Sequence, residues 1–444
     1  MNTGKRNEMN QNMEQGDGPL IGFFPLFFNI SETGRAVLVA KRYRELGGKS
    51  IFFSHGGEYE YFAKDLGFDI IRIKPYFTED FIKRYFSIAR GEKKEEIFTE
   101  AFLKEAVENE IKIFKETGIK ALVSTNNEPC TLSARAAKIP LIAITTGPGR
   151  FQYSIPDIYE NNFTRFVPKF IKIRLFNWMI PRTKAHLKTF NTLAKKYNLK
   201  PLKGTMDLYY GDITLITNFL EFISIFPNQQ QFPAEDYIGI ILLEEMFKNN
   251  FSEEQTKTVD REVFNHLKGS QKNILLSMGS SGDKTLFLKI LDKLSDTSYR
   301  VIAVYTNILK EDELPIFNEN ILFKKYVPSL SQLHKMVDLS IIHGGQGTVY
   351  TAAYSGKPII GYPMQFEQHL NLEKMVGHGA GLMLSKKFFD GKKLSKSIEY
   401  IFENYNQFLK NAQILSKKLP APEGDKNAAR RIVEVLNQHK DIQA

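Results

Sequence analysis

The sequence has one cysteine, one tryptophan and no hydrophobic run long enough to cross a membrane. Because Cys130 is the only cysteine, an internal disulfide and a cysteine metal cluster are both excluded. The nearest approach to a membrane span is LIGFFPLFF from Leu20, which is about half the required length and contains Pro25. The N-terminal stretch MNTGKRNEMNQNMEQGDGP is polar and lacks the apolar core of a signal peptide. These absences predict a cytoplasmic chain with a disordered lead-in at residues 1–18.

Acidic residues are missing from one long segment. Between Asn161 and Lys203 there are eleven Lys or Arg and no Asp or Glu, while the whole chain carries a net charge of +10. Phe, Trp and Ile are interleaved with these cations, a mixture that suits the boundary of an anionic membrane. The alternative is a solvated helical face over an ordinary pocket. Nucleic acid is not an expected partner, because no recognised binding motif accompanies the charge.

The length and composition are those of a globular chain with two domains. The 444 residues are 42% hydrophobic and 25% charged. Short apolar runs alternate with amphipathic segments in both halves, which predicts parallel sheets covered by helices on both faces. The expected strands are LIGFFPLF, SIFFSHG, DIIRIKP, ALVST, PLIAITT and ITLITN, then NILLSMG, YRVIAVYT, ILFKKYV, LSIIHG, PIIGYP and GLML.

This alternation predicts an α/β protein with two doubly wound Rossmann-like domains that face each other across a cleft. It lapses in the polar stretch from Lys248 to Asn273, which marks the boundary. We expect a first domain at 19–247, a linker at 248–272 and a second domain at 273–420. A C-terminal helix at 421–444 is expected to pack back toward the first domain.

The strongest motif of the chain is HGGQGTVYTAAYSGKPIIGYPMQFEQHLN, which begins with a glycine-rich loop. The strand LSII ends at Ile342, His343 begins the turn, and a helix is expected to begin at Gly347-Thr348. Ligands of open α/β sheets bind at the carboxyl ends of the strands, and a helix N-terminus there suits a phosphate. A glycine-rich turn without a ligand is the other interpretation, since one glycine loop is weak evidence.

The same stretch resembles the donor-binding signature of the UDP-glycosyltransferases with the two-domain GT-B fold. KYVPSLSQLHKMVD resembles the family's aromatic-Val-Pro-Gln segment, SMGSSGD resembles its Gly-Ser loop, and RAVLVAKRYRELGGKSIFFSHG looks like its first helix and second strand. The resemblance covers roughly residues 20–435 and is weakest between Phe151 and Lys203. It implies that the first domain binds the acceptor and that the second domain binds the nucleotide sugar. The residues at the signature's spacings are His343, Gly345, Thr348, Gly356, Pro358, Glu367, Gln368 and Asn371.

The resemblance implies a donor site made of oriented hydrogen-bond donors, without a metal or any cofactor besides the nucleotide sugar. No Asp-x-Asp stands in a suitable loop. By this resemblance, the diphosphate would be bound by His343, Gly345, Thr348, Gly279 and Ser280, together with the loop glycines Gly344 and Gly347. The nucleotide base would be bound by Tyr326 and Val327. The hydroxyl groups of the sugar would be bound by Glu367 and Gln368.

Three positions depart from the family pattern. Thr351 stands where a ribose-binding Glu is usual, which predicts looser discrimination between nucleotides. Glu32 stands where the catalytic His is usual, and Thr125 and Asn126 stand where its orienting Asp is usual. Glu32 is therefore the candidate general base, provided that burial raises its pKa. Alternatively, Ser31 caps the helix and Glu32 only complements the positive helix end.

The resulting prediction is an inverting, metal-independent hexosyltransferase. It would move a sugar from a nucleotide diphosphate, expected to be a UDP-sugar, to a hydroxyl acceptor that is a lipid or otherwise hydrophobic. The basic segment adds an expected peripheral position on the inner face of the membrane. A catalytically silent GT-B binding partner and a nucleotide-sugar epimerase are the alternatives.

Overall fold

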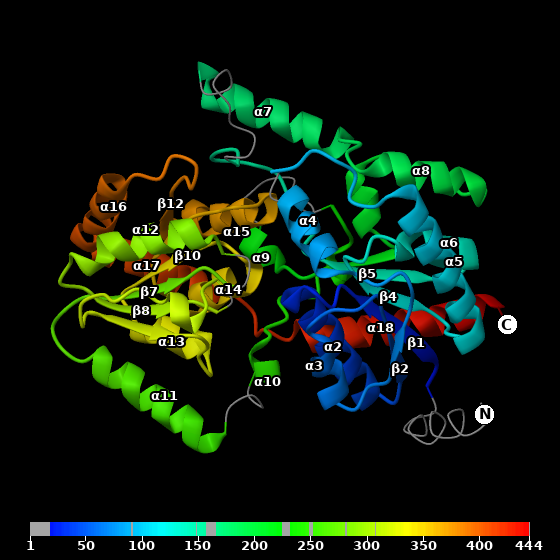
Figure 1. The fold of residues 1–444 in the computed structure, drawn as a ribbon, viewed down its shortest axis with the longest axis horizontal. Coiled ribbons are helices and arrows are strands. Elements are labelled where there is room, and N and C mark those ends of the chain that lie inside the picture. Colours follow the sequence, from blue (N-terminus) through cyan, green and yellow to red (C-terminus); the bar gives the residue numbers. More distant parts are fainter. Residues whose placement is uncertain are drawn as a thin grey trace.

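The structure is a computed structural model that describes residues 18–89, 92–147, 149–156, 166–223, 231–247, 252–279, 282–306 and 308–443 (Figure 1). Apart from Gly18, the predicted lead-in at 1–18 lies outside the described residues. Two α/β domains stand side by side, each around its own sheet. The predicted fold class is confirmed.

The first domain is built on six parallel strands in the spatial order β3–β2–β1–β4–β5–β6. Its core contains side chains from the strands and from the helices packed on them, such as Phe23, Phe52 and Val37. The strands are β1 (Leu20–Pro25), β2 (Lys49–Ser54), β3 (Ile70–Arg72), β4 (Leu122–Thr125), β5 (Leu141–Thr145) and β6 (Ile213–Ile216). The helices are α2 (Ile30–Glu45), α3 (Glu60–Asp65), α4 (Glu79–Ala89), α5 (Glu100–Thr117), α6 (Cys130–Ala137), α7 (Lys169–Met179), α8 (Leu187–Lys196), α9 (Leu220–Ile223) and α10 (Glu244–Phe247).

The second domain repeats this plan with the strand order β12–β11–β10–β7–β8–β9, again all parallel. The strands are β7 (Asn273–Ser277), β8 (Arg300–Val304), β9 (Ile321–Lys324), β10 (Leu339–Ile342), β11 (Ile359–Gly361) and β12 (Gly381–Met383). The helices are α11 (Glu253–His266), α12 (Lys284–Ser295), α13 (Leu330–Met336), α14 (Gln346–Ser355), α15 (Phe366–Gly377), α16 (Gly391–Glu403), α17 (Tyr405–Lys418) and α18 (Gly424–Gln443).

Part of the predicted linker is helical and belongs to the second domain. Ser252 and Gln255 form a capping box that starts α11. Val263 and Leu267 of this segment pack against Leu275 and Ile302 of the second sheet. The second domain therefore begins by Glu253 rather than at residue 273.

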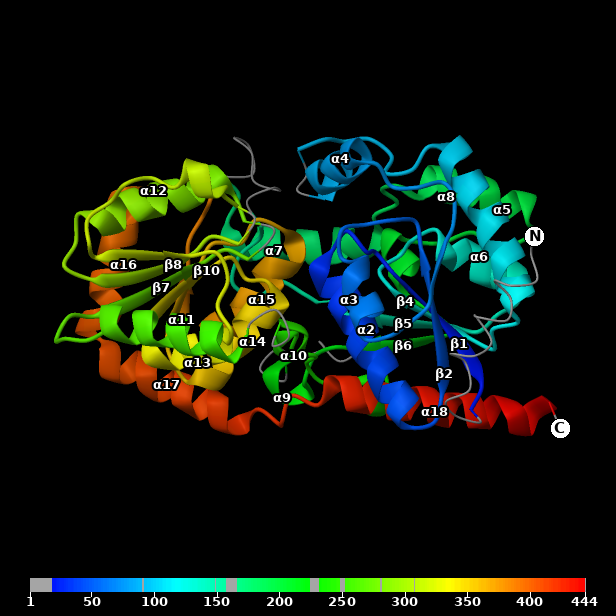
Figure 2. The same ribbon diagram turned by 60° about the horizontal axis from the view of Figure 1, so that its bottom comes forward.

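The C-terminal helix α18 crosses to the first domain. It lies along α2 in Figure 2, and its residues Ala428 and Ile432 are part of the first domain's core. The Arg42 guanidinium in α2 donates to Asp425 of α18 at 2.6 Å. The two domains are therefore joined by the end of the chain as well as by the segment before α11.

None of the helices in the described part of the chain combines the length and the apolar character that crossing a bilayer requires.

Candidate functional site

The glycine loop lies at the carboxyl end of β10, as predicted, and leads directly into α14. Gly344 has a φ of +94°, and a Cβ there would lie 2.6 Å from the Gln368 carbonyl oxygen, so only glycine fits. Helix α14 begins at Gln346, one residue before the predicted start, with Gly345 as its N-cap. Gly347 in the first turn is exposed, and no atom lies within 4 Å of the place where its Cβ would be. The first N–H groups of α14 are thus open to an anionic ligand.

The His343 ring lies between Gly279 and Gly345, two glycines that the sequence resemblance assigns to the same site. A Cβ at Gly279 or at Gly345 would lie 2.5 Å from the imidazole ring. The ring is buried, and burial lowers the pKa of His343 to about 4. At neutral pH the imidazole is uncharged, so it can offer a diphosphate one neutral N–H donor rather than a cation.

The other predicted donor residues are dispersed around this loop. Tyr326 follows β9 with 37% of its surface exposed, while the side chain of Val327 packs into the core beside Val263. Thr348 is half-buried in the first turn of α14. Thr351 is buried, and its hydroxyl donates to the Thr348 carbonyl at 3.0 Å, which leaves it pointing at its own helix. Ser280 lies outside the described residues.

Glu367 and Gln368 start α15 but have different surroundings. Glu367 is half-buried, lines a cavity between the domains and accepts from the Asn371 amide at 3.3 Å. Gln368 is buried, and its side-chain oxygen accepts from the Met364 N–H at 2.9 Å. This oxygen therefore holds the segment after β11, a structural role that spacing alone did not indicate.

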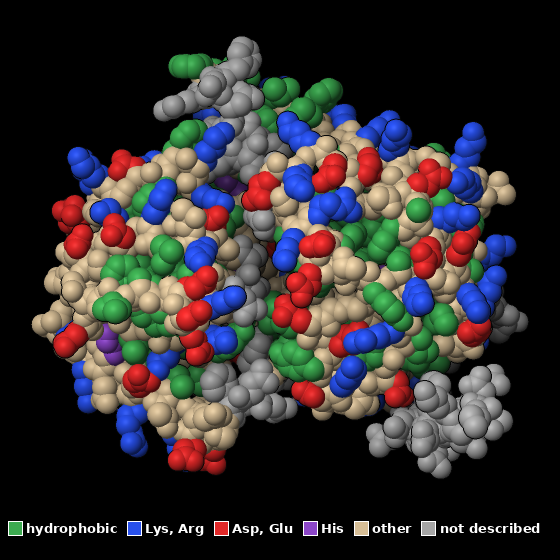
Figure 3. All heavy atoms as spheres, in the orientation of Figure 1, with side chains coloured by type: hydrophobic (Ala, Val, Ile, Leu, Met, Phe, Trp, Pro, Cys, Tyr) green, Lys and Arg blue, Asp and Glu red, His purple; other side chains and the backbone are tan. Residues whose placement is uncertain are grey.

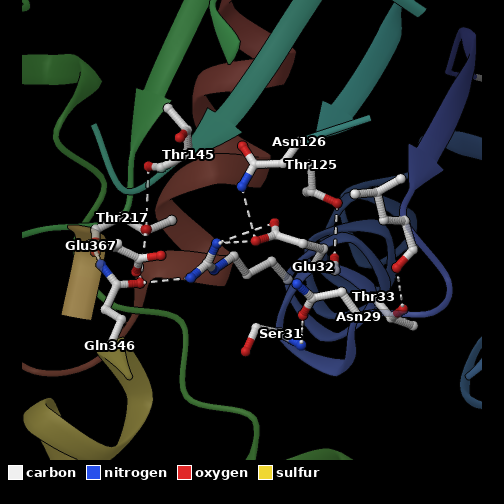
Figure 4. Close-up of polar contacts among 12 residues, drawn as sticks. Asn29, Ser31, Glu32, Thr33, Thr125, Asn126, Thr145, Thr217, Gln346 and Glu367 are labelled. Carbon is white, nitrogen blue, oxygen red and sulfur yellow. Dashed lines mark hydrogen bonds and ion pairs between the residues drawn. The ribbon is translucent and has the colours of Figure 1, made fainter. Parts of the chain in front are cut away.

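Glu32 stands in the first turn of α2, at the carboxyl edge of the first sheet (Figure 4). The helix is capped by Asn29, which accepts from the Ser31 N–H at 3.0 Å, so the alternative of Ser31 as the cap is wrong. Asn126 donates to the Glu32 carboxylate at 2.9 Å, and Thr125 donates to the Glu32 carbonyl at 2.9 Å. The two positions where a His–Asp dyad is usual are thus in direct contact.

The pKa of Glu32 is raised above its ordinary value. Burial is the largest cause; the nearby Glu367 acts in the same direction, whereas Arg35 and the Asn126 hydrogen bond oppose it. The side chain is 5% exposed. A carboxylate that is desolvated in this way is a better proton acceptor than an exposed one.

Arg35 connects Glu32 to the glycine loop across the domain boundary (Figure 4), and sequence reasoning missed it. One guanidinium nitrogen lies 3.0 and 3.2 Å from the two Glu32 oxygens, and the other donates to the Gln346 side chain at 3.0 Å. Thr217 also donates to that Gln346 oxygen, at 3.1 Å. The candidate base and the start of α14 are therefore held in one hydrogen-bonded chain.

A cavity between the domains adjoins Glu367. It is lined by Thr146 and Asn218 from the first domain and by Glu367, Asn371 and Lys374 from α15. The Lys374 ammonium donates to Asn218 at 3.1 Å and to Asn371 at 3.4 Å, and burial lowers its pKa to about 8. Lys374 therefore remains largely cationic at neutral pH, close to the Glu367 carboxylate.

The same helix also anchors a loop of the first domain. The Glu373 carboxylate accepts from the backbone N–H groups of Gln152, Tyr153 and Ser154 at 2.9 to 3.0 Å. His369, one turn earlier, contacts the Ser154 hydroxyl at 3.0 Å. These contacts place the loop after β5 against α15.

Within the described residues there is no group of three or more His, Cys, Asp or Glu side chains that could hold a metal ion.

Comparison with known proteins gives one family match and several full-length structural matches. Residues 264–431 match the glycosyltransferase family 28 C-terminal domain. The chain superposes on the calicheamicin glycosyltransferase CalG4 with a TM-score of 0.63, at 15% identity over 95% of this chain and 99% of that one. The glycosyltransferase VinC, solved in complex with DTDP, gives a TM-score of 0.60 at 14% identity over 94% of this chain and 100% of that one.

Two curated relatives match part of the chain. A PGL/p-HBAD biosynthesis glycosyltransferase of Mycobacterium tuberculosis (strain ATCC 25177 / H37Ra) is 26% identical over 297 residues, 65% of this chain and 64% of that protein. The uncharacterized UDP-glucosyltransferase YojK of Bacillus subtilis (strain 168) is 26% identical over 263 residues, 57% of this chain and 60% of that protein. The aligned part thus spans less than two thirds of these relatives.

The fold is therefore the two-domain GT-B fold, and the family match and the relatives agree with the glycosyltransferase resemblance that the sequence predicts.

Proposed function

We propose that this protein transfers a hexose from a nucleoside diphosphate donor, a UDP-sugar, to a hydroxyl acceptor. The observation that carries this proposal is a hydrogen bond between α2 of the first domain and α14 of the second, two helices that begin at the carboxyl edges of their sheets. Arg35 beside Glu32 and Gln346 at the start of α14 are joined at 3.0 Å, so a buried carboxylate faces an open helix N-terminus across the domain boundary. The Bacillus subtilis relative YojK is named a UDP-glucosyltransferase, which supports the UDP form of the donor.

The donor diphosphate would lie at the N-terminus of α14. Exposed Gly347 lets a phosphate approach the backbone N–H groups, Thr348 adds a hydroxyl and neutral His343 adds an N–H. Oriented donors of this kind stabilise the negative charge that develops on the leaving nucleoside diphosphate.

We expect His343→Ala and Thr348→Ala each to weaken nucleoside diphosphate binding roughly tenfold, the scale of one hydrogen bond to a charged group. Calorimetric titration with UDP, dTDP and GDP would measure this loss of affinity. The same titrations would show whether the wild type discriminates weakly between the three nucleotides, as expected with buried Thr351 in place of a ribose-binding Glu. Thr258→Ala, whose hydroxyl donates only to its own helix α11, is the matched control and should bind as the wild type does. Wild-type affinity in both loop variants, with intact folding, would remove the donor site from this loop.

Glu32 would act as the general base in a single displacement. Its carboxylate takes the proton of the acceptor hydroxyl while that oxygen attacks the anomeric carbon. The bond from this carbon to the diphosphate oxygen breaks, and the nucleoside diphosphate leaves with the electron pair. Attack opposite the leaving group inverts the anomeric centre.

The catalytically silent alternative rests on the missing His–Asp dyad. Asn126 donates to Glu32 at 2.9 Å, so a carboxyl with an orienting partner stands in the same place. This contact supports an enzyme over a silent binding partner.

We expect Arg35→Ala to shift the acid limb of the kcat/KM profile to higher pH. The base must be ionised, so activity falls as pH drops through the pKa of Glu32, which burial raises and Arg35 lowers. Removing the cation removes the lowering contribution, and the limb moves up. Arg35→Lys keeps a positive charge and should keep the limb close to its wild-type position. An unmoved limb in Arg35→Ala would show that Glu32 is not the titrating group.

We also propose that α7 holds the enzyme against anionic lipid. Phe166, Phe170 and Trp178 are 86%, 73% and 59% exposed. Phe170, Arg174 and Trp178 recur every four residues and share one helix face with Ile171, Leu175 and Met179, which are also exposed. Figure 3 shows green side chains together with blue ones over this part of the molecule, at the top of the view.

The opposite face of α7 packs on the protein. Phe176 is buried with Phe151 and with Leu370 of α15, so this ring of the basic aromatic segment is not available to a membrane. Helix α7 therefore bridges from the first domain to the sugar-binding helix of the second. A lipid acceptor held at its outer face would lie beside the cleft.

An anionic bilayer suits this face better than a second copy of the chain. The described part of the segment, residues 166–203, contains no acidic residue, so two such faces would repel each other. The Arg182 guanidinium lies 4.9 Å from the centre of the Trp178 ring, which pairs a cation with an aromatic ring at the expected headgroup level.

A further inference from the structure

The loop from Asn126 to Glu128, directly after β4, contains buried polar atoms without partners. Among the described residues, the unpartnered atoms of this loop are Oδ1 of Asn126, Oδ1 and Nδ2 of Asn127, and Oε2 of Glu128. Asn127 and Glu128 are 1% and 0% exposed. A buried polar atom without a hydrogen bond costs stability, and several in one loop indicate a ligand or water that belongs there.

Glu128 is held on one side only. Tyr85 of α4 donates to its Oε1 at 2.8 Å, and Tyr209, at the end of the 3-10 helix Thr205–Tyr209, approaches the same oxygen at 3.4 Å. Within the described part of the chain, the second oxygen, Oε2, has no hydrogen-bond partner. Burial raises the pKa of Glu128 to about 7, and the nearby Glu32 carboxylate adds to this rise. The group can therefore accept or donate a hydrogen bond near neutral pH.

The position of the loop relates it to the candidate base. Asn126 donates to Glu32 at 2.9 Å, and Glu128 follows two residues later at the same carboxyl edge of the sheet. The ring of Tyr85, whose hydroxyl donates to Glu128, packs 5.1 Å from the buried ring of Phe28, so Glu128 adjoins an aromatic cluster. In Figures 1 and 2, α4 lies close to the boundary between the two domains.

We propose that Asn127 and Glu128 form a second hydroxyl-binding subsite, so that the acceptor is a ring with two neighbouring hydroxyl groups. One hydroxyl reacts at Glu32, and the other donates to Glu128 Oε2 and exchanges hydrogen bonds with the Asn127 amide. The aromatic ring of Tyr85, whose hydroxyl holds Glu128, then lies beside the ring of the acceptor. This inference rests on the proposed transferase function and adds the class of acceptor to it.

The test is transfer to matched acceptors that differ in one feature, the second hydroxyl. The probes are 6,7-dihydroxy-4-methylcoumarin against 7-hydroxy-4-methylcoumarin, and trans-cyclohexane-1,2-diol against cyclohexanol, which distinguish an aromatic diol from a saturated ring diol. In the wild type, kcat/KM is expected to be roughly tenfold higher for the diol in at least one pair, the scale of one hydrogen bond to a charged group. Glu128→Gln and Asn127→Ala should remove most of this preference, mainly through KM.

Glu128→Gln keeps an oxygen for Tyr85, and nucleoside diphosphate affinity reports whether each variant remains folded. Equal use of both members of each pair by the wild type would overturn the inference. So would a preference retained in both variants, or transfer to none of the probes by an enzyme that binds its donor; the loop would then hold only water. Failure to bind any nucleoside diphosphate would instead contradict the proposed function itself.

Discussion

Replacing Glu32 by glutamine is expected to lower turnover by roughly a hundredfold or more, the usual contribution of a general base. Glutamine is nearly isosteric and can still accept from Asn126 and Arg35, which now contact Glu32 at 2.9 and 3.0 Å. It cannot take a proton from the acceptor hydroxyl. Nucleoside diphosphate affinity should stay within about twofold of the wild type, because the donor loop is unchanged. Steady-state kinetics with a saturating donor would measure the effect.

Glu110→Gln is the matched control for this experiment. Glu110 is also fully buried, but its partners His55 and Ser133 lie inside the first domain. The control should change stability and leave turnover per folded molecule nearly unchanged. Wild-type turnover in Glu32→Gln would show that Glu32 is not the general base and only belongs to the first turn of α2.

Reversing two charges on α7 is expected to weaken binding to anionic vesicles by roughly thirtyfold or more, since each Lys or Arg near such a surface contributes about 1 kcal/mol. The variant is Lys169→Glu with Arg174→Glu, both exposed in the wild type. Phe170→Ser with Trp178→Ser should weaken binding independently of salt, because burial of the rings is not screened. Sedimentation with anionic and neutral vesicles at low and high salt would separate the two contributions.

Lys195→Glu with Lys200→Glu is the matched control, with the same change of charge in the same basic segment. Lys195 lies on α8, and the apolar face of this helix is buried in the first domain. The next residue, Lys196, forms an ion pair with Glu100 at 2.5 Å. This control should bind nearly as well as the wild type. Equal recovery of every variant in the supernatant would contradict lipid docking, and concentration-dependent dimerisation through α7 would favour a second copy as its partner.

Both sheets were predictable from the sequence because their strands are buried on both faces. A strand such as Leu339–Ile342 reads as an uninterrupted apolar run and needs no knowledge of its neighbours. The glycine loop was predictable for a similar reason. Gly344 satisfies a local requirement, a positive φ, and such requirements leave a trace in the local sequence.

Contacts between distant segments were not predictable in the same way. Arg35 and Gln346 are 311 positions apart, and Glu128 is joined to Tyr85 and Tyr209 over 43 and 81 positions. Nothing in the sequence near Arg35 indicates that its guanidinium leaves α2 for the second domain. The spacing of Gln368 does not reveal that the Met364 N–H lies next to its side chain.

The sequence by itself determined the two-sheet architecture, the glycine loop at the end of β10 and the concentration of cations between residues 161 and 203. Each depends on periodicity, composition or local backbone geometry, which adjacent residues encode. Only the tertiary structure decided that Glu32 is buried against Arg35 and Asn126, and that Phe176 faces α15 while Trp178 faces outward. Apolar residues occur on both faces of α7, so the sequence could not show which face is covered. Burial depends on what the rest of the chain packs against each face, and this is why the chemistry of the site follows from the fold rather than from the motif alone.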